Sequence, residues 1–292
     1  MAYSLERETH IWLPEGEPRA VVQIIHGMAE HIGRYERFAK DLNRRGYAVA
    51  GLNLRGHGEN AEIKGWFAEK DGWTCLLDDA RKLTETLRKR FPGKKLVLMG
   101  HSMGSFLARE YVIRFRGGVD ALVLSGTGHY GLPLCGAGWL LAKLSPAKKP
   151  AEFVNGIAFV GNNKPFEPGR TPFDWLTRNE QAVDEYVASP LCGFTFTGSA
   201  FADFFGGLVA LTGMGRVREV PKALPVLFVS GDADPVGQMG KGVRITEQEY
   251  RKAGLTDLTV KLYKDGRHEL ISELNRDEVI GDLADWLDTK CM

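Results

Sequence analysis

The sequence lacks most of the features that mark membrane, metal-binding or nucleic-acid-binding proteins. It has 4 cysteines among 292 residues, and none of them forms a C-x-x-C pair or another metal-ligand spacing. No stretch approaches the ~18 continuous apolar residues of a membrane span, and residues 1–8 contain no apolar core of a signal peptide. The formal net charge of +1 excludes a broad field that would attract nucleic acid or an anionic membrane.

These absences favour a protein of the reducing cytoplasm that uses neither a metal ion nor a nucleic acid partner. The cysteines are expected to be free, buried thiols. The length allows one large α/β domain with an insertion, or two small domains, and neither an internal repeat nor a low-complexity linker divides the chain. The four cysteines are Cys75, Cys135, Cys192 and Cys291.

Apolar runs alternate with amphipathic segments along most of the chain. This alternation predicts an α/β fold, in which a mostly parallel sheet is covered by helices on both faces. An antiparallel edge strand is expected over residues 4–13. The other expected strands are residues 20–25, 47–54, 95–99, 121–124, 225–229 and 258–263, and the expected helices are residues 34–45, 73–90, 103–115, 240–253 and 276–287.

Residues 127–218 interrupt this alternation and are rich in glycine, proline and aromatic side chains. A structureless loop of this length is uncommon in a compact domain, so we expect an inserted cap, or lid, above the carboxyl edge of the sheet. Residues 1–126 and 219–292 would then form the core. We interpret most cap aromatics, and the apolar stretch 138–141, as the core of the cap itself; for that stretch, transient contact with a membrane or micelle is the alternative.

The pentapeptide at residues 100–104, Gly-His-Ser-Met-Gly, has the form G-x-S-x-G. It follows an expected strand and precedes an expected helix, and strand, sharp turn and helix in this order give the motif its meaning. Gly100 and Gly104 have no Cβ atoms, so the strand and the helix can approach closely there. The pattern predicts Ser102 as a nucleophile at the tip of the turn, with an incidental serine in a glycine-rich turn as the alternative.

A serine hydroxyl needs a base to remove its proton, and the base needs a group that orients it. In this fold the partners follow in the order serine, acid, histidine, each after a strand. His268 follows the last expected strand and is the expected base. Asp232 and Asp234 both follow the expected strand 225–229. Asp234 lies deeper in that loop beside Pro235, which stiffens it, and is favoured, while Asp232 is interpreted as a turn residue.

Two backbone N–H groups are expected to stabilise the oxyanion that forms during attack. One belongs to Met103, which directly follows Ser102 at the start of a helix. The other belongs to Met28, in the loop after the expected strand 20–25. Because both donors are backbone groups, the identity of the side chains matters little.

Two further features of this region have structural interpretations. His26 and His31 are five residues apart, but no third ligand is near, so we expect them to stabilise the loop rather than to bind a metal. The glycine-rich segment 53–58 lacks the spacing and the lysine of a phosphate-binding loop. We interpret it as support for the loop that contains Met28.

This combination of motifs resembles the α/β-hydrolase superfamily, in the branch of the monoacylglycerol lipases and bacterial lysophospholipase-like hydrolases. The resemblance covers nearly the whole chain outside residues 127–218. Its most specific part is H-G-x-x-E-H-x-x-R-Y at residues 26–35, and Glu59-Asn60-Ala61 departs from the family, whose members often have serine there. The stretches that carry the resemblance are 26–35, 55–58, 100–104, 231–234 and 264–270.

The resemblance implies Ser102, Asp234 and His268 as a catalytic triad, with Met28 and Met103 as oxyanion donors and no metal or organic cofactor. It also implies hydrolysis of acyl esters from small amphiphilic, single-chain substrates through an acyl-enzyme.

Other functions are weighed against this one. A serine aminopeptidase or amidase on the same scaffold is the alternative, because a fold does not fix the substrate and cap carboxylates could hold a substrate ammonium. A non-catalytic binding protein is disfavoured, since nucleophile, acid and base are all present, and a dehalogenase or epoxide hydrolase would need a carboxylate at position 102. The cap carboxylates are Glu152, Glu167, Asp174, Glu180, Asp184 and Glu185.

Overall fold

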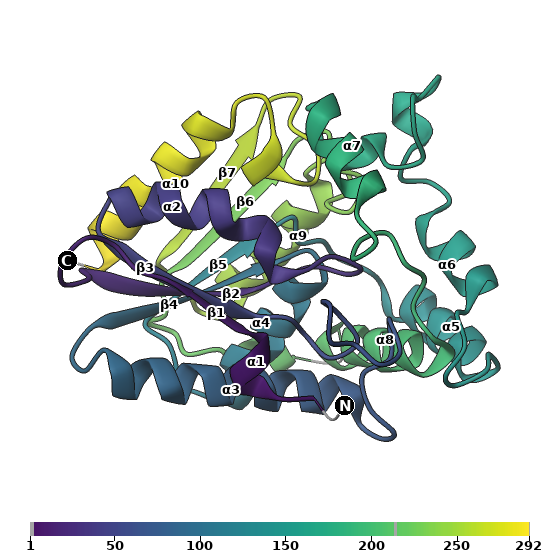
Figure 1. The fold of residues 1–292 in the computed structure, drawn as a ribbon, viewed down its shortest axis with the longest axis horizontal. Helices are drawn as coiled ribbons and strands as arrows, with labels where there is room; N and C mark the ends of the chain where they lie inside the picture. The colour runs from purple at the N-terminus through teal and green to yellow at the C-terminus, as the bar shows by residue number, and fades with distance from the viewer. Residues whose placement is uncertain (1–2, 213–214, 292) are drawn as a thin grey trace.

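The computed structural model of the chain describes residues 3–212 and 215–291. In this part of the chain seven strands form one sheet in the order β1-β3-β2-β4-β5-β6-β7 (Figure 1). β1 runs antiparallel to β3, and the other neighbours are parallel, which confirms the predicted α/β fold. The strands are β1 (Thr9–Trp12), β2 (Ala20–Ile25), β3 (Tyr47–Leu52), β4 (Lys95–His101), β5 (Ala121–Ser125), β6 (Val226–Gly231) and β7 (Leu258–Tyr263).

The edge strand expected over residues 4–13 is shorter than predicted. Leu5–Glu8 forms a helical turn, α1, and Thr9–Trp12 alone pairs with β3. The residues of this turn are leucine, glutamate and arginine, which favour helix, and none of them is β-branched. The turn also buries Glu8, whose carboxylate accepts a hydrogen bond of 3.0 Å from Nδ2 of Asn53.

Helices cover both faces of the sheet (Figure 1). Neighbouring residues of β2 show why: Val21 packs into one apolar core and Val22 into the other, as the alternation of a strand requires. These helices lie within a few residues of the bounds that the periodicity predicts. The first core includes α3 (Gly72–Arg90), α4 (Met103–Arg114) and α9 (Lys241–Lys252), and the second includes α2 (Glu36–Arg44) with η1 (Ile32–Tyr35) and α10 (Arg276–Cys291) with η5 (Leu270–Ser272).

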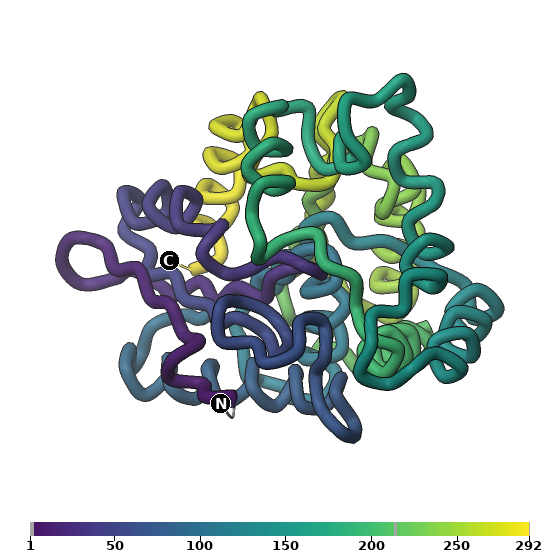
Figure 2. Tube along the Cα trace, turned by 45° about the vertical axis from the view of Figure 1, so that its right-hand side comes forward, coloured from purple at the N-terminus to yellow at the C-terminus, as the bar shows by residue number. Residues whose placement is uncertain are grey.

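Between β5 and β6 the chain leaves the sheet and forms a separate helical layer. Figure 2 shows this segment in teal and green at the right of the molecule. The division expected at residues 127 and 218 stays a prediction, and a search of the described helices for one with the length and hydropathy of a membrane span finds none. The elements of the segment are α5 (Leu132–Lys143), α6 (Glu152–Phe159), η2 (Lys164–Phe166), η3 (Asp174–Leu176), α7 (Glu180–Ala188), α8 (Gly198–Thr212) and η4 (Arg216–Glu219).

Candidate active site

Ser102 lies in the turn between β4 and α4, with φ +52° and ψ −121°. A non-glycine residue rarely adopts a positive φ, and such strain gathers at functional sites. The flanking glycines permit the turn, because a Cβ on Gly100 would lie 2.2 Å from the Gly104 carbonyl oxygen and a Cβ on Gly104 would lie 2.1 Å from that of Ile25. The close approach of strand and helix predicted from these glycines is therefore confirmed.

The structure brings Asp234 and His268 together. Nδ1 of the His268 ring lies 3.0 Å from each carboxylate oxygen of Asp234, and both side chains are buried. The Asp234 carboxylate also accepts a hydrogen bond of 2.9 Å from the N–H of Val236. Asp232 is exposed and accepts a hydrogen bond from the N–H of Asp265, so the geometry gives it the expected turn role and favours Asp234 as the partner of the histidine.

Ser102 and His268 line the same cavity, which has a volume of about 560 Å³. Nε2 of His268 is buried and has no hydrogen-bond partner among the described residues, so this nitrogen is available to a hydroxyl group. The contact between a nucleophile and its base often becomes short only when substrate binds. The structure thus places the nucleophile and base expected from the sequence at one cavity, while their catalytic roles stay a prediction.

Burial and charge act in opposite directions on the Asp234–His268 pair. Burial would lower the pKa of His268, but the carboxylate of Asp234, together with those of Glu269 and Glu30, outweighs this effect, and the pKa is raised above its ordinary value. Burial would raise the pKa of Asp234, but His268 and nearby backbone N–H groups outweigh this effect, and the pKa is lowered. Asp234 is therefore ionised at neutral pH and suited to stabilise an imidazolium.

The neighbours of the His268 ring fix its position. The ring centroids of His101 and Trp175 lie 4.8 and 5.1 Å from that of His268. Gly126, with φ +59°, leaves room for the ring, because a Cβ there would lie 2.8 Å from Cε1 of His268. Burial lowers the pKa of His101 to about 4, so this ring is neutral at pH 7 and does not repel an imidazolium beside it.

Both expected oxyanion donors lie at the cavity. Met28 and Met103 line it together with Ser102. Met103 is the first residue of α4, where backbone N–H groups have no acceptor within the helix. Ala29, directly after Met28, has φ +52°, so the chain turns sharply at the first donor. The role of the two N–H groups stays a prediction.

The loop after β2 is held by hydrogen bonds to the segment 53–58. Nε2 of His26 accepts a bond of 3.0 Å from the N–H of Leu54, and Nε2 of His57 accepts one of 3.2 Å from the N–H of Ala29. Burial lowers the pKa of both rings to about 3, which keeps them neutral acceptors. In the described chain no group of three or more side chains could hold a metal. The supporting roles expected for His26 and for segment 53–58 are thus confirmed.

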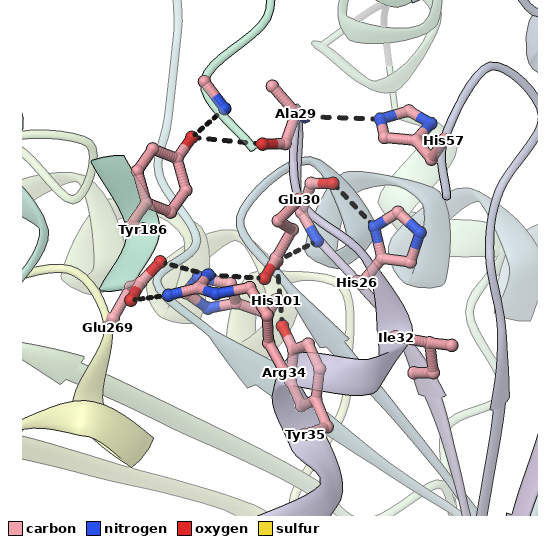
Figure 3. A network of polar contacts seen from close by, with 12 residues as sticks. His26, Ala29, Glu30, Ile32, Arg34, Tyr35, His57, His101, Tyr186 and Glu269 are labelled. Carbon is pink, nitrogen blue, oxygen red and sulfur yellow. Dashed lines mark hydrogen bonds and ion pairs between the residues drawn. The ribbon is translucent and has the colours of Figure 1, made fainter. Parts of the chain in front are cut away.

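A buried ion network beside the site was not predicted from the sequence (Figure 3). Arg34 donates hydrogen bonds to the carboxylates of Glu30 and Glu269, and Glu269 directly follows His268. Arg34 and Glu269 are 235 positions apart in the sequence, so no local pattern indicates their contact. The available signal is position, because these charges adjoin the expected oxyanion loop and the expected base.

The wall of the cavity is mostly apolar and, among the described residues, contains no lysine or arginine. Its carboxylates are those of Glu30 and Glu269, and both already bind Arg34. Many wall side chains come from the segment between β5 and β6, which agrees with the expectation that some aromatics of this segment face the site. They include Leu134, Leu141, Phe159, Phe173, Trp175 and Phe204.

The sequence matches the family described as serine aminopeptidase, S33, over residues 16–275. It is 27% identical to a monoacylglycerol lipase of Mycolicibacterium smegmatis over 282 residues, which are 95% of this chain and 91% of the relative. It is 28% identical to a monoglyceride lipase of Homo sapiens over 267 residues, which are 90% of this chain and 80% of the relative.

Two solved structures are similar to this chain over nearly its whole length. A thermostable carboxyl esterase from Bacillus coagulans, in complex with glycerol, is 26% identical with a TM-score of 0.89 over 97% of this chain and 93% of that chain. A monoacylglycerol lipase from Paleococcus ferrophilus, 23% identical, shares the fold with a TM-score of 0.70 over 97% of this chain and 98% of that one. With its α/β-hydrolase fold and a family match over most of its length, the chain belongs to the α/β-hydrolase family described as serine aminopeptidase, S33.

Proposed function

We propose that this chain is a serine carboxylic-ester hydrolase that cleaves uncharged, single-chain acyl esters of the monoacylglycerol type. Curated relatives that span nearly its whole length are named monoacylglycerol lipase and monoglyceride lipase. Ser102 and His268 line one cavity, and Asp234 contacts the His268 ring; this arrangement suits acyl transfer through a covalent intermediate.

The observation that carries this choice of substrate is that the described cavity wall contains no cationic side chain and no carboxylate without an ion-pair partner. No lysine or arginine lines the described cavity, so the phosphate of a lysophospholipid would be buried without a cation, which is costly. Glu30 and Glu269 are bound to Arg34, so the ammonium of a peptide N-terminus would find no unpaired carboxylate. A neutral ester with an apolar chain avoids both costs.

The cap carboxylates that kept the aminopeptidase alternative open lie outside the cavity wall. Asp184 forms an ion pair with Arg170, and Asp174 accepts a hydrogen bond of 2.6 Å from the hydroxyl of Thr171. Glu152 accepts one of 2.8 Å from Thr195. These contacts give the carboxylates local structural roles, so they do not favour an aminopeptidase.

In the proposed mechanism, His268 takes the hydroxyl proton of Ser102 as the oxygen attacks the ester carbonyl, and Asp234 stabilises the imidazolium. The N–H groups of Met28 and Met103 hold the oxyanion of the tetrahedral intermediate. Return of the proton to the alcohol oxygen releases the alcohol and leaves an acyl-enzyme. A water that loses a proton to His268 then attacks the acyl carbon, the bond from this carbon to Oγ of Ser102 breaks, and the imidazolium returns the proton to Oγ as the acid leaves.

The segment 127–218 is proposed to act as the cap that receives the acyl chain. The interpretation of the stretch 138–141 as cap core is wrong for Trp139 and Leu140, which are 41% and 56% exposed. Phe153 on the neighbouring helix α6 is 71% exposed as well, and exposed apolar side chains of this kind are suited to transient contact with a membrane or micelle. The cytoplasmic location expected from the cysteines stays a prediction.

The test is hydrolysis of p-nitrophenyl esters from acetyl to palmitoyl by the wild type and by Ser102→Ala. We expect kcat to fall by about 10⁴-fold or more in the variant, since the covalent step is lost. A second assay compares a monoacylglycerol with a lysophosphatidylcholine of the same acyl chain, and we expect the neutral ester to react at least about 10-fold faster. A folded wild type that is inert on esters and cleaves aminoacyl amides would replace this proposal with the aminopeptidase alternative.

A further inference from the structure

A buried carboxylate–guanidinium–carboxylate group connects two loops of the site (Figure 3). Nη1 of Arg34 lies 2.8 Å from Oε2 of Glu30 and 2.7 Å from Oε1 of Glu269, and Nη2 lies 2.7 Å from Oε2 of Glu269. The side chains of Arg34, Glu30 and Glu269 are 17%, 4% and 7% exposed. One guanidinium thus binds the loop after β2 and the residue that follows His268.

The other end of Glu30 holds the loop next to the expected oxyanion donor. Its Oε1 accepts hydrogen bonds of 2.5 Å from the N–H of Gly27 and 3.0 Å from the hydroxyl of Tyr35. Gly27 immediately precedes Met28 and packs under the nucleophile, because a Cβ on Gly27 would lie 3.1 Å from Cβ of Ser102. A shift of Glu30 would therefore move the peptide that carries the donor.

The same group also meets α7. The guanidinium of Arg34 lies 4.9 Å from the centre of the Tyr186 ring, and the Tyr186 hydroxyl donates a hydrogen bond of 3.1 Å to the carbonyl oxygen of Ala29. The N–H of Gly193 donates to the same carbonyl at 2.9 Å. The residues on both sides of Met28 are therefore held by contacts that converge on Arg34.

A buried ion pair is poor evidence for a role in stability, because its desolvation cost often cancels the attraction between the charges. This group is placed where it affects the reaction instead. The carboxylate of Glu269 belongs to the residue after the expected base, and that of Glu30 accepts a hydrogen bond from the loop of the expected oxyanion donor. Two carboxylates and one guanidinium also leave a net charge of −1 beside a ring that becomes a cation during the reaction.

We propose that Arg34, bridging Glu30 and Glu269, is a positioning residue that fixes the oxyanion donor Met28 relative to the base His268. The inference rests on the proposed function for the roles of Met28 and His268. In this arrangement Arg34 contacts neither substrate nor the reacting atoms. It acts through the two loops, and the conservative replacement by lysine keeps its charge while losing the two-pronged geometry.

The kinetic test compares Arg34→Met with Arg34→Lys in the full chain, using p-nitrophenyl butyrate. We expect kcat to fall about 30-fold or more in Arg34→Met while KM changes less than about threefold, since orientation and not binding is lost. Arg34→Lys should recover part of the loss. If Arg34→Met does not fold, Glu269→Gln carries the same test, with an expected fall in kcat of about 10-fold.

The matched control is Arg216→Met. Nη1 of Arg216 binds both carboxylate oxygens of Glu110, at 2.9 and 3.0 Å, and neither residue lines the cavity. This variant also breaks a partly buried arginine–glutamate pair, so it should lose thermal stability while kcat stays within about twofold of the wild type. A folded Arg34→Met with the kcat of the control would overturn the proposal.

A second readout does not depend on hydrolysis. The carboxylates that raise the pKa of the His268 ring are those of Asp234, Glu269 and Glu30, and the His101 ring, which is neutral at pH 7, lies beside it. NMR titration of the His268 ring in wild type and in Glu269→Gln should show the midpoint at lower pH in the variant, by about half a unit or more. An unmoved midpoint contradicts the electrostatic part. If the wild type cleaves no ester, the proposed function fails, and this titration still decides whether the group acts on His268.

Discussion

At the residue scale, the carboxylate of Asp234 controls the charge of the ring beside it. The pKa of His268 is raised, and a general base must be neutral, so activity should be lost as the pH falls through this raised value. In Asp234→Asn the acid limb should move to lower pH, and kcat should fall by about 10³- to 10⁴-fold because the ring loses its orienting partner. The measurement is kcat/KM between pH 5 and 9. If the acid limb of the Asp234→Asn profile stayed at the pH of the wild type, the loss of activity at low pH would come from the titration of a group other than His268.

Gly126 offers a second prediction at this scale. A Cβ at this position would lie 2.8 Å from Cε1 of His268, and φ is +59°. We therefore expect Gly126→Ala to displace the ring and lower kcat by about 10-fold or more, with a loss of about 1–2 kcal/mol in the free energy of unfolding.

Gly117→Ala is the control for this prediction, because Gly117 has φ +77° and a Cβ there would meet nothing within 4 Å. It should show a similar loss in the free energy of unfolding and an unchanged kcat. Equal kinetics of the two variants would mean that the ring tolerates the added methyl group.

The residues of the expected triad could be named from the sequence because each follows a strand in a fixed order along the chain. The contacts of Arg34 could not, because its partner Glu269 lies 235 positions away. The same holds for Tyr186, whose hydroxyl meets Ala29 across 157 positions. Strand order and periodicity predict backbone paths, whereas such side-chain contacts depend on how separate loops are packed.

At the scale of elements, the tight junction of β4 and α4 makes a stability prediction. Gly104→Ala would bring a Cβ within 2.1 Å of the carbonyl oxygen of Ile25 on β2, so the helix must move away from the sheet. We expect a loss of about 2 kcal/mol or more in the free energy of unfolding, measured by urea denaturation. In contrast, Gly281→Ala on α10 meets nothing within 4 Å and should stabilise the protein by about 0.5–1 kcal/mol.

Element positions were largely predictable, since the core alternates between strands buried on both faces and amphipathic helices. The segment between β5 and β6 was predictable only as an interruption. Its helices are short or apolar on more than one side, and its exposed side chains, such as Phe153 and Leu144, do not follow the pattern of a helix that faces one core.

At the scale of the whole molecule, buried neutral histidines should make stability depend on pH. Burial lowers the pKa of His26 and His57 to about 3 and that of His101 to about 4, against about 6.5 in an unfolded chain. Below about pH 6.5 these histidines therefore bind protons in the unfolded chain but stay neutral in the folded chain. The free energy of unfolding falls as the pH falls. His268, with its raised pKa, acts in the opposite direction and offsets part of this loss.

The expected size is about 2 kcal/mol for each such ring between pH 7 and pH 5. His57→Gln keeps an acceptor for the N–H of Ala29 and removes one titrating group. Urea denaturation at the two pH values should show a difference in the free energy of unfolding that is smaller by about this amount in the variant. The same difference in both proteins would mean that His57 takes up its proton without unfolding.

The adjacency of β5 and β6 has a consequence for how such a chain can evolve. The two strands are parallel, hydrogen-bonded neighbours, with Ser125 opposite Val229, so the segment between them leaves the carboxyl end of one strand and returns to the amino end of the next. An exchange of that segment need only reconnect these two neighbouring strands and leaves the rest of the sheet order unchanged. Ser102 and His268 are set by β4 and by the loop after β7, outside the exchanged piece. Selection can therefore change which substrate is recognised without changing the residues that cleave the bond.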